Sequence, residues 1–445
     1  MSFSEALLVF VVMAPGAVFA TLATLWLLGW VPSERVLSRI TGVTFGACVL
    51  GLARMQWILA RTHAAAVTVT FGNWFAVHEY RFPLVLVADH LSLPFLAMTI
   101  VLSGLIGQFS ATYLHRESGF FRFFLLLHLF AFGSLLAFAA GSFDLLIGGW
   151  ELVGITSVLL IAFFDQRPSP VENGLRVFGV YRACDIGLLL GVFGMHNWAS
   201  TASFAGGMPR LAGSQATVVC LFLLLSAAGK AAQIPFSGWL PRAMEGPTPS
   251  SAVFYGAISI HAGAYLLLRA QPLLAEARAA SLAVIVTGLA TAIYGTMAGR
   301  ASADAKTSLA FASLTQVGLI FVEIGFGWKS VAVAHVLGHA FVRTLQFLRA
   351  PSMLHDYHRM HSAIGGEVSH GHTEGLLPEQ VRRWFYRWAL DRGHLDTILD
   401  RWFIHPLLQV SRLFAQMDGI GVARLSKRGT NLANALRSPA GQGVE

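Results

Sequence analysis

Charged and titratable side chains lie in the middle of apolar segments, where they could take up and release protons. Glu151 lies in Gly-Gly-Trp-Glu-Leu-Val-Gly, and Lys230 lies in Ala-Gly-Lys-Ala-Ala-Gln-Ile-Pro, which ends at Pro235. A dry environment favours the neutral amine of a lysine, whereas a nearby carboxylate favours the ammonium. A lysine and a glutamate of variable separation therefore form a proton switch. We predict that Glu151 and Lys230 are such a pair, with a structural ion pair as the alternative for Glu151.

Pro235 should interrupt the helix that carries the lysine. Proline removes a backbone donor and disfavours helical structure at the preceding residue, so the helix should break just after Lys230. A broken helix at membrane depth exposes backbone polar groups and is tolerated only inside protein or beside water. The break therefore predicts a hydrated seam next to the lysine.

Three histidines in apolar segments add groups that exchange protons near neutral pH. His335 and His339 are four residues apart and share one helical face, with Arg343 one turn further along. His261 lies in an earlier apolar segment. We interpret the three histidines as a proton relay. The alternatives are haem or metal ligation by His335 and His339.

Other ionisable side chains lie in the same kind of segment. Arg182 and Asp185 are three residues apart on one helical face. They either support a proton path or neutralise one another so that the helix can enter the bilayer. Lys306 is assigned to the path itself, and Glu323 and Arg343 to supporting ion pairs or an exit. A charge at the bilayer centre costs about 2.5–3.5 kcal/mol on insertion scales, so we predict that these groups line a water-filled route.

The elements that position these groups must be membrane helices. Of the 445 residues, 55% are hydrophobic and only 12% are charged, whereas a soluble domain carries about 25% charged residues. A span needs about 20 mostly apolar residues. We therefore predict an all-α polytopic membrane protein with 11 transmembrane helices, one of them broken. The expected spans are 6–30, 40–60, 85–113, 120–140, 142–164, 174–196, 215–240, 250–270, 280–299, 306–326 and 329–350.

Two regions outside the spans have patterns of their own. Residues 66–82 alternate apolar and polar side chains, which predicts a small extracytoplasmic β-hairpin with its turn near Gly72 and Asn73. Residues 378–390 and 395–425 predict amphipathic helices on the membrane surface or against a partner. Residues 351–377 are interpreted as a solvated linker, with metal binding as the alternative. This linker carries His355, His358, His361, His370 and His372.

Charge sets the expected orientation and excludes one class of partner. The net charge is +8, and 12 of the 31 Lys and Arg lie from Arg349 onward. With the N-terminus outside, 21 basic residues face the cytoplasm and 6 face outward, which favours a C-terminus inside. A basic tail on an otherwise apolar chain suits an anionic membrane surface and not nucleic acid. The three cysteines lie singly in apolar runs, which gives no metal spacing and no disulfide framework.

Residues 142–350 resemble the antiporter-like subunits of respiratory complex I, particularly its largest one, and the related Mrp-type antiporter subunits. The resemblance rests on stretches that occur in the family's order: Gly149 to Gly154, Arg182 to Asp185, Gly229 to Gln233, Gly246 to Pro249, Asp304 to Lys306, the pair His335 and His339, and His405 to Leu408. It implies two inverted five-helix repeats. Glu151 and Lys230 would serve a first half-channel, and Lys306, His335 and His339 would lead into a second.

The chain departs from the family pattern at two positions and in length. The family usually has a histidine at Tyr255 and a lysine at Arg343, and an arginine does not release its proton readily. No further span is expected after residue 348. We divide the chain into N-terminal helices with the hairpin (1–141), an antiporter-like core (142–350), the linker (351–377) and a cytoplasmic tail that docks a partner (378–445).

A shortened subunit of this kind is similar to the DabB-type membrane subunits of bacterial inorganic-carbon transporters. That resemblance implies a non-enzymatic transporter subunit of the bacterial inner membrane without a cofactor. Its partner would be a large peripheral subunit resembling a zinc-dependent β-carbonic anhydrase, and ion flux would power bicarbonate accumulation. The alternatives are a subunit of a complex-I-like or multi-subunit cation/proton antiporter, and a redox membrane protein that binds a cofactor.

Overall fold

The computed structural model describes residues 1–77, 80–302, 304–364 and 378–391, and short pieces between 393 and 417; the side chains of Tyr255, Arg382 and residues 351–364 lie outside this description. Residues Met1–Asp396 form one compact unit and Thr397–Glu445 a second. The predicted helix at 395–425 falls mostly outside the described residues, as do His370 and His372 of the predicted linker.

Eleven helices in the described part of the chain are long and apolar enough to cross a membrane, which confirms the predicted number. The eighth span is composite, because α9 (Thr248–Ser251) continues through a π-helical turn, Ala252–Ala257, into α10 (Ser259–Arg269). The other ten are α1 (Phe3–Leu27), α2 (Glu34–Thr62), α3 (Ser92–Tyr113), α4 (Phe120–Ala139), α5 (Phe143–Ile161), α6 (Pro168–Ala199), α7 (Gly213–Lys230), α12 (Arg278–Arg300), α13 (Ala305–Gly325) and α14 (Lys329–Ile364).

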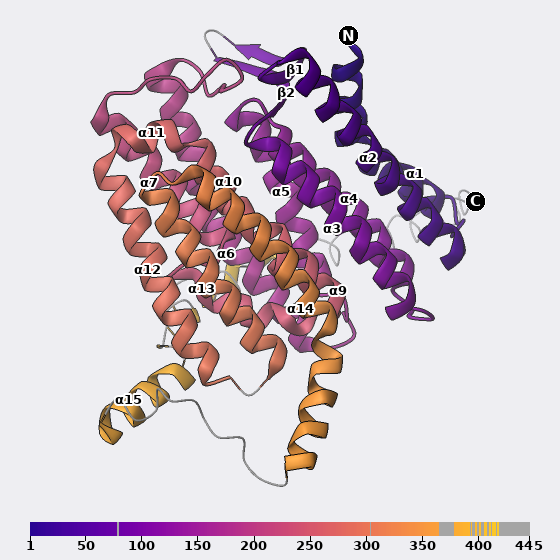
Figure 1. Cartoon of the computed structure of the whole chain (residues 1–445), viewed down its shortest axis with the longest axis vertical. Helices are drawn as coiled ribbons and strands as arrows, with labels where there is room; N and C mark the ends of the chain where they lie inside the picture. The colour runs from indigo at the N-terminus through magenta and orange to yellow at the C-terminus, as the bar shows by residue number, and fades with distance from the viewer. Residues whose placement is uncertain are drawn as a thin grey trace, which may run out of the picture. The chain divides into compact units, whose positions relative to one another are not determined.

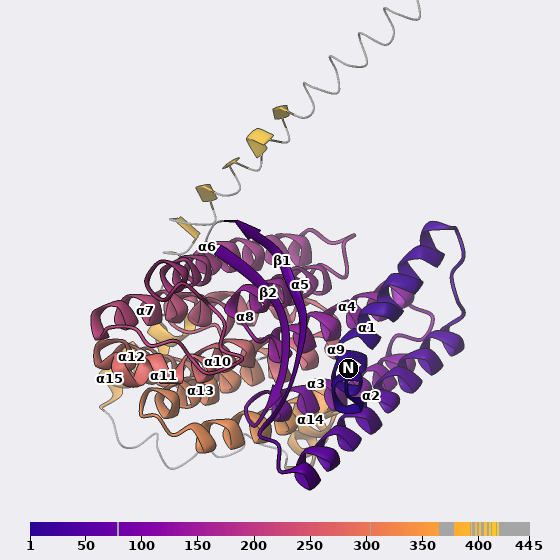
Figure 2. The ribbon, with the colours of Figure 1, turned by 90° about the horizontal axis from the view of Figure 1, so that it is seen from above.

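The β-hairpin is longer than predicted, and its predicted turn is wrong. Strand β1 (Ala66–Val77) pairs antiparallel with β2 (Tyr80–Asp89), so Gly72 and Asn73 lie inside β1, next to two irregularities in register. The apolar residues 85–88 were predicted to begin the third span. They are instead buried in β2, where the carbonyl of Val85 accepts a hydrogen bond from the Gly141 amide at 2.8 Å. Figure 2 shows the hairpin lying across the ends of the helices.

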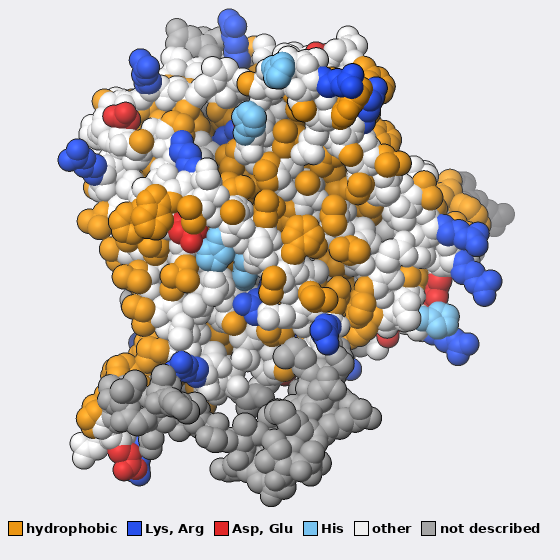
Figure 3. All heavy atoms as spheres, in the orientation of Figure 1, with side chains coloured by type: hydrophobic (Ala, Val, Ile, Leu, Met, Phe, Trp, Pro, Cys, Tyr) orange, Lys and Arg blue, Asp and Glu red, His pale blue; other side chains and the backbone are white. Residues whose placement is uncertain are grey.

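The N-terminus and the hairpin lie at one end of the helices, which we call the hairpin side (Figure 1). At the opposite end, the tail side, α14 continues to Ile364, beyond its predicted end at residue 350. The amphipathic helix predicted at 378–390 is confirmed as α15 (Glu379–Leu390). It packs on α12, with Trp388 edge-on to Tyr294 at a centroid distance of 6.0 Å. The space-filling view in Figure 3 shows hydrophobic side chains over the middle of one face and most basic ones toward its ends.

Small residues let neighbouring helices approach closely. A Cβ added at Gly288 of α12 would lie 2.4 Å from the Gly318 carbonyl of α13, and a Cβ at Gly318 would lie 2.6 Å from the Gly288 carbonyl. Only glycine fits at either position without moving a backbone. Lipid gives helices no hydrophobic reason to associate, so such close packing supplies much of the attraction between them.

Helix α7 ends at Lys230, as the sequence predicted. Ala232 has a positive φ of 52°, and three short helices follow, η1 (Phe236–Gly238), α8 (Trp239–Arg242) and η2 (Ala243–Glu245). The freed backbone groups find partners inside the protein, as a membrane requires. The amide of Ile234 donates to Thr291 Oγ1 of α12 at 3.0 Å, and Trp239 Nε1 donates to the Gly229 carbonyl at 3.0 Å.

Candidate proton path

Helices α5, α6 and α7 bring four of the predicted residues into one cluster. Lys230 ends α7 and is 1% exposed. Its Nζ donates to the Trp150 carbonyl at 3.2 Å and lies 4.2 Å from the ring centre of Tyr181 and 4.8 Å from that of Trp150. Ring faces attract cations, more strongly when both are desolvated. The lysine is therefore held by a carbonyl and two aromatic rings.

The two carboxylates of this cluster are held by Arg182. Arg182 forms an ion pair with Glu151 and a second one with Asp185 at 2.8 Å, so the predicted Arg182–Asp185 pair is present. Asp185 also accepts a hydrogen bond from Trp150 Nε1 at 2.6 Å. Among the described residues, no carboxylate lies within ion-pair distance of Lys230. We call Glu151, Arg182, Asp185 and Lys230, with Trp150, the lysine site.

The lysine site balances its charges as a group. Two carboxylates face two cations, so the fully ionised cluster is neutral. The side chain of Glu151 is 37% exposed, so it has room to turn. Gly154 makes space for the lysine, because a Cβ there would lie 3.0 Å from Lys230 Nζ. This explains a glycine three residues after Glu151.

A second cluster joins α10 and α14 through two buried histidines. His261 Nε2 lies 2.9 Å from His339 Nδ1. His261 Nδ1 donates to the Ala257 carbonyl, which the π-helical turn leaves available because the His261 amide bonds Ile258 instead. When both rings are neutral, His261 Nε2 must therefore accept from His339 Nδ1–H. His339 Nε2 is then an unprotonated, buried nitrogen without a hydrogen-bond partner.

His335 lies one turn before His339 and makes two further contacts. Its Nδ1 lies 2.8 Å from Glu323 Oε1 and its Nε2 lies 2.9 Å from Gln316 Oε1. The ring of His335 thus bridges the carboxylate of Glu323 on one side and the amide group of Gln316 on the other. We call His261, His335, His339 and Glu323 the histidine site.

Lys306 does not join the histidine site. It is half-buried in the first turn of α13, at the tail side, whereas Glu323 lies near the other end of that helix. The 17 residues between them correspond to about 25 Å along the helix axis. Arg343 is 8% exposed, one turn beyond His339, and its Nε lacks a partner.

An ion pair that was not predicted from the sequence ties the hairpin to the helices. Arg269, the last residue of α10, is 8% exposed and donates to both carboxylate oxygens of Asp89, at 2.5 and 3.2 Å. Burial alone would raise the pKa of Asp89, but the hydrogen bond and charge of Arg269 outweigh burial and hold that pKa below its ordinary value. No spacing signal links residues 180 positions apart in the chain.

A polar cluster on the hairpin side was also missed, although its spacing could have revealed it. Asp144 comes seven residues before Glu151, two helical turns along the same face of α5. His196 comes eleven residues after Asp185, three turns along the same face of α6. His196 Nε2 lies 2.9 Å from Asp144 Oδ1.

The described residues form eleven helices able to span a membrane, with a break beside a buried lysine and ionisable groups along the interior, and this arrangement defines a multi-pass membrane protein of the antiporter-like class. The family model for "NADH:quinone oxidoreductase/Mrp antiporter, TM" matches residues 140–365, which carry both sites. The model for "NADH-Ubiquinone oxidoreductase (complex I), chain 5 N-terminus" matches residues 74–124. The chain belongs to this family of complex I and Mrp antiporter-like membrane subunits.

Individual relatives agree with this placement. The chain is 36% identical over 275 residues to NADH-quinone oxidoreductase subunit L of Mycobacterium tuberculosis, which covers 61% of this chain and 43% of that one. It is 32% identical over 316 residues to NADH-ubiquinone oxidoreductase chain 5 of Allomyces macrogynus, covering 70% and 49%. The chain spans about half the length of the curated relatives it matches.

Solved structures show the same fold. A chain of the Mrp complex from Dietzia sp. DQ12-45-1b superposes with a TM-score of 0.65 at 24% identity, covering 77% of this chain and 37% of that one. A chain of the membrane-bound sulfane sulfur reductase, an archaeal respiratory membrane complex, gives a TM-score of 0.66 at 21% identity, covering 78% and 70%.

Proposed function

We propose that this chain conducts protons across the membrane as the antiporter-like subunit of a larger complex. The observation that carries the proposal is the buried amino group of Lys230 beside two carboxylates that Arg182 holds. Taking one of these carboxylates from Arg182 to Lys230, or back, changes which charge state of the lysine is favoured. The lysine site is thus a switch with two cations competing for the carboxylates.

Glu151 is the moving part of this switch. When Arg182 holds Glu151, the buried lysine lacks a carboxylate partner, and release of its proton is favoured. When Glu151 turns to Lys230, proton uptake is favoured. Helix α10 packs against α7, and we propose that the released proton moves on to His261 and His339. His339 Nε2 is the free atom that can accept it.

A flux assay tests this proposal. The purified protein is reconstituted into liposomes that contain a pH-sensitive dye, and a potassium diffusion potential drives protons inward. We expect flux from the wild type and background flux from Lys230→Ala and Glu151→Ala, with Lys329→Ala, at the first residue of α14, as the matched control. Sodium-free and sodium-containing buffers separate H⁺ from Na⁺. Absence of flux from a fully inserted wild type would contradict the proposal.

More specifically, we propose that the complex lies in the bacterial inner membrane and accumulates inorganic carbon. The N-terminus would lie outside and the tail inside. Proton flux would power conversion of CO₂ to bicarbonate by a peripheral zinc-dependent subunit resembling a β-carbonic anhydrase. The sequence resemblance supports this, and so does α15, an amphipathic helix on the tail side that exposes Trp384 and Tyr386 beside Arg383 and Arg387. Such a surface suits a peripheral partner.

A second candidate is a subunit of a complex-I-like or multi-subunit cation/proton antiporter. The names of the relatives, quinone oxidoreductase subunits and an Mrp complex, favour it. The two candidates differ in partner. Affinity purification from native membranes followed by mass spectrometry should recover a zinc protein resembling a β-carbonic anhydrase, and less of it from a variant lacking residues 378–445. Recovery of NADH-oxidising or antiporter subunits instead would favour the second candidate.

A further inference from the structure

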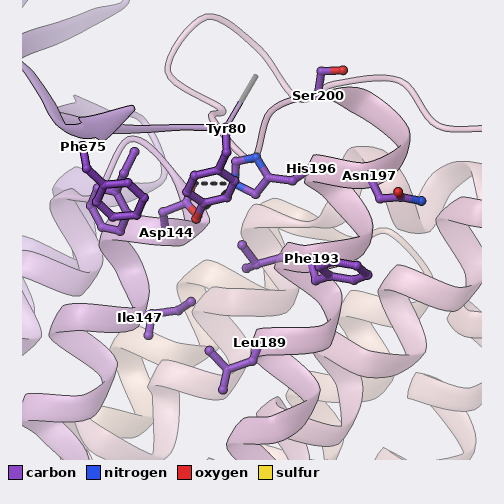
Figure 4. Close-up of a pocket in the computed structure, with 11 residues that line it drawn as sticks. Phe75, Tyr80, Asp144, Ile147, Leu189, Phe193, His196, Asn197 and Ser200 are labelled. Atoms are coloured by element: carbon purple, nitrogen blue, oxygen red, sulfur yellow. Dashed lines mark hydrogen bonds and ion pairs between the residues drawn. The ribbon is translucent and has the colours of Figure 1, made fainter. Parts of the chain in front are cut away.

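On the hairpin side, a tyrosine of β2 and a histidine of α6 both contact one carboxylate of α5. Asp144 accepts hydrogen bonds from Tyr80 Oη at 2.9 Å and from His196 Nε2 at 2.9 Å. Asp144 is 2% exposed, and the side chain of His196 is 10% exposed. The rings of Tyr80 and His196 lie 4.2 Å apart (Figure 4). We call Tyr80, Asp144 and His196 the hairpin-side triad.

The hydrogen bonds identify which atom of the triad can take a proton. Nε2–H of His196 donates to the Asp144 carboxylate, so Nδ1 of the neutral ring carries a lone pair. This Nδ1 is buried and has no hydrogen-bond partner. Protonation there gives an imidazolium that directly faces a carboxylate. Burial and then the hydrogen bond to Asp144 raise the pKa of Tyr80 to about 12, so Tyr80 keeps its proton and remains a donor.

A cavity of about 570 Å³ leads from the triad along the groove between α5 and α6. Below the triad it is lined by apolar side chains, and Ile147 and Leu189 lie furthest from the hairpin among the labelled residues (Figure 4). Ile147 precedes Glu151 by four residues, and Leu189 follows Asp185 by four. The end of the cavity furthest from the hairpin is therefore one helical turn from the lysine site along α5 and α6, and it opens at the outer face of α6, where Leu189 is 53% and Phe193 is 68% exposed.

We propose that the hairpin-side triad is the proton-loading site that connects the lysine site to the solution on the hairpin side, with His196 Nδ1 taking up the proton. The inference rests on the proposed function. Asp144 and Glu151 are separated by two turns, about 10 Å along α5, so transfer needs water in the cavity.

Titratable groups face His196 from the elements packed against α6. Helix α5 presents Asp144 and, two turns deeper, Glu151. Helix α7, the other long helix packed on α6, carries Cys220 and Lys230 as its titratable residues, and β2 contributes Tyr80. Further groups lie elsewhere: Glu172, Arg176, Tyr181, Arg182, Cys184 and Asp185 deeper along α6, Arg242 and Glu245 on α8 and η2 at its tail side, and Arg81 and Asp89 on β2.

The test measures proton flux in liposomes while the pH on the hairpin side is varied. His196→Gln keeps a donor for Asp144 but cannot carry a proton, and we expect it to lower flux about tenfold near neutral pH. Asp144→Asn removes the carboxylate that favours the imidazolium, so the midpoint of the pH profile should move to lower pH. Ser214→Ala, at an exposed position in the first turn of α7 outside this cavity, is the control and should behave as wild type.

The outcomes separate the loading site from the proposed function. Wild-type rate and pH profile in inserted His196→Gln, with flux still abolished by Lys230→Ala, would overturn the loading site alone. An unchanged midpoint in Asp144→Asn would also overturn it. Absence of flux from the wild type would overturn both proposals.

Discussion

The lysine site and the histidine site handle charge in different ways. In the lysine site, Glu151, Asp185 and Arg182 are tied together by ion pairs, and Lys230 is held by a carbonyl and aromatic rings. In the histidine site, two buried rings bond directly to each other at 2.9 Å. The first site is made of groups that are charged in water, and the second contains rings that can be neutral.

This difference indicates a division of labour. A buried charge is costly unless it is compensated, so the charged groups of the lysine site must rearrange together. That rearrangement decides whether the site holds or releases its proton. A pair of imidazoles stores no charge at rest and passes a proton along its hydrogen bond. We therefore infer that the lysine site sets when a proton moves, and that the histidine site sets where it goes.

Replacing Arg182, the cation that competes with Lys230 for the carboxylates, should reduce proton flux the most. Arg182→Gln frees Glu151 and Asp185 to pair with Lys230, which then holds its proton more tightly. Each 1.4 kcal/mol of additional stabilisation slows release tenfold, and we expect a loss of about 100-fold. The measurement is liposome flux, with Arg278→Gln, in the first turn of α12, as control. Wild-type flux in Arg182→Gln would show that Arg182 only balances charge.

Breaking the relay should have an intermediate effect. His339→Gln preserves a polar side chain but not a titrating one, and flux should fall about tenfold because water replaces part of the relay. Added imidazole should restore flux in His339→Gln, because it replaces the missing imidazole ring as a proton carrier. It should not restore flux in Lys230→Ala, which lacks the lysine of the switch. The absorption spectrum checks the alternative role: a Soret band in the wild type that is lost in His339→Gln would replace the relay by a cofactor site.

Crowding the lysine should have the smallest effect. Gly154→Ala places a methyl group 3.0 Å from the present position of Lys230 Nζ, so the ammonium must move by a few tenths of an ångström. We expect flux to fall about threefold, with normal insertion. The matched control is Gly148→Ala, because nothing lies within 4 Å of a Cβ added there. Equal flux in the two variants would show that the lysine does not need its present position.

The sequence predicted the local features well. Eleven spans follow from length and hydropathy, and the break after Lys230 follows from Pro235, because both depend on neighbouring residues. The pair Arg182–Asp185 follows from helical spacing. The hairpin turn was misplaced because residues 85–88 are as apolar as a span, and only the packing of the strand on the helix ends distinguishes the two.

Partners between distant segments could not be read from the sequence. Glu151 was paired with Lys230, whereas Arg182 holds it in the structure, and which of two cations is nearer depends on how α5, α6 and α7 pack. Lys306 was placed on the path, but it lies at the tail side of α13. The contact between His261 and His339 joins residues 78 positions apart, and a π-helical turn that no pattern predicted prepares it.

The central claim is that Lys230 gives up its proton during transport, and Lys230→Arg tests it most directly. Arginine keeps the positive charge and can satisfy the same carbonyl and rings, but it holds its proton at any physiological pH. In liposomes with the variant inserted as well as the wild type, we predict flux no higher than in Lys230→Ala. Flux equal to that of the wild type would show that residue 230 acts as a fixed charge, and would contradict the account.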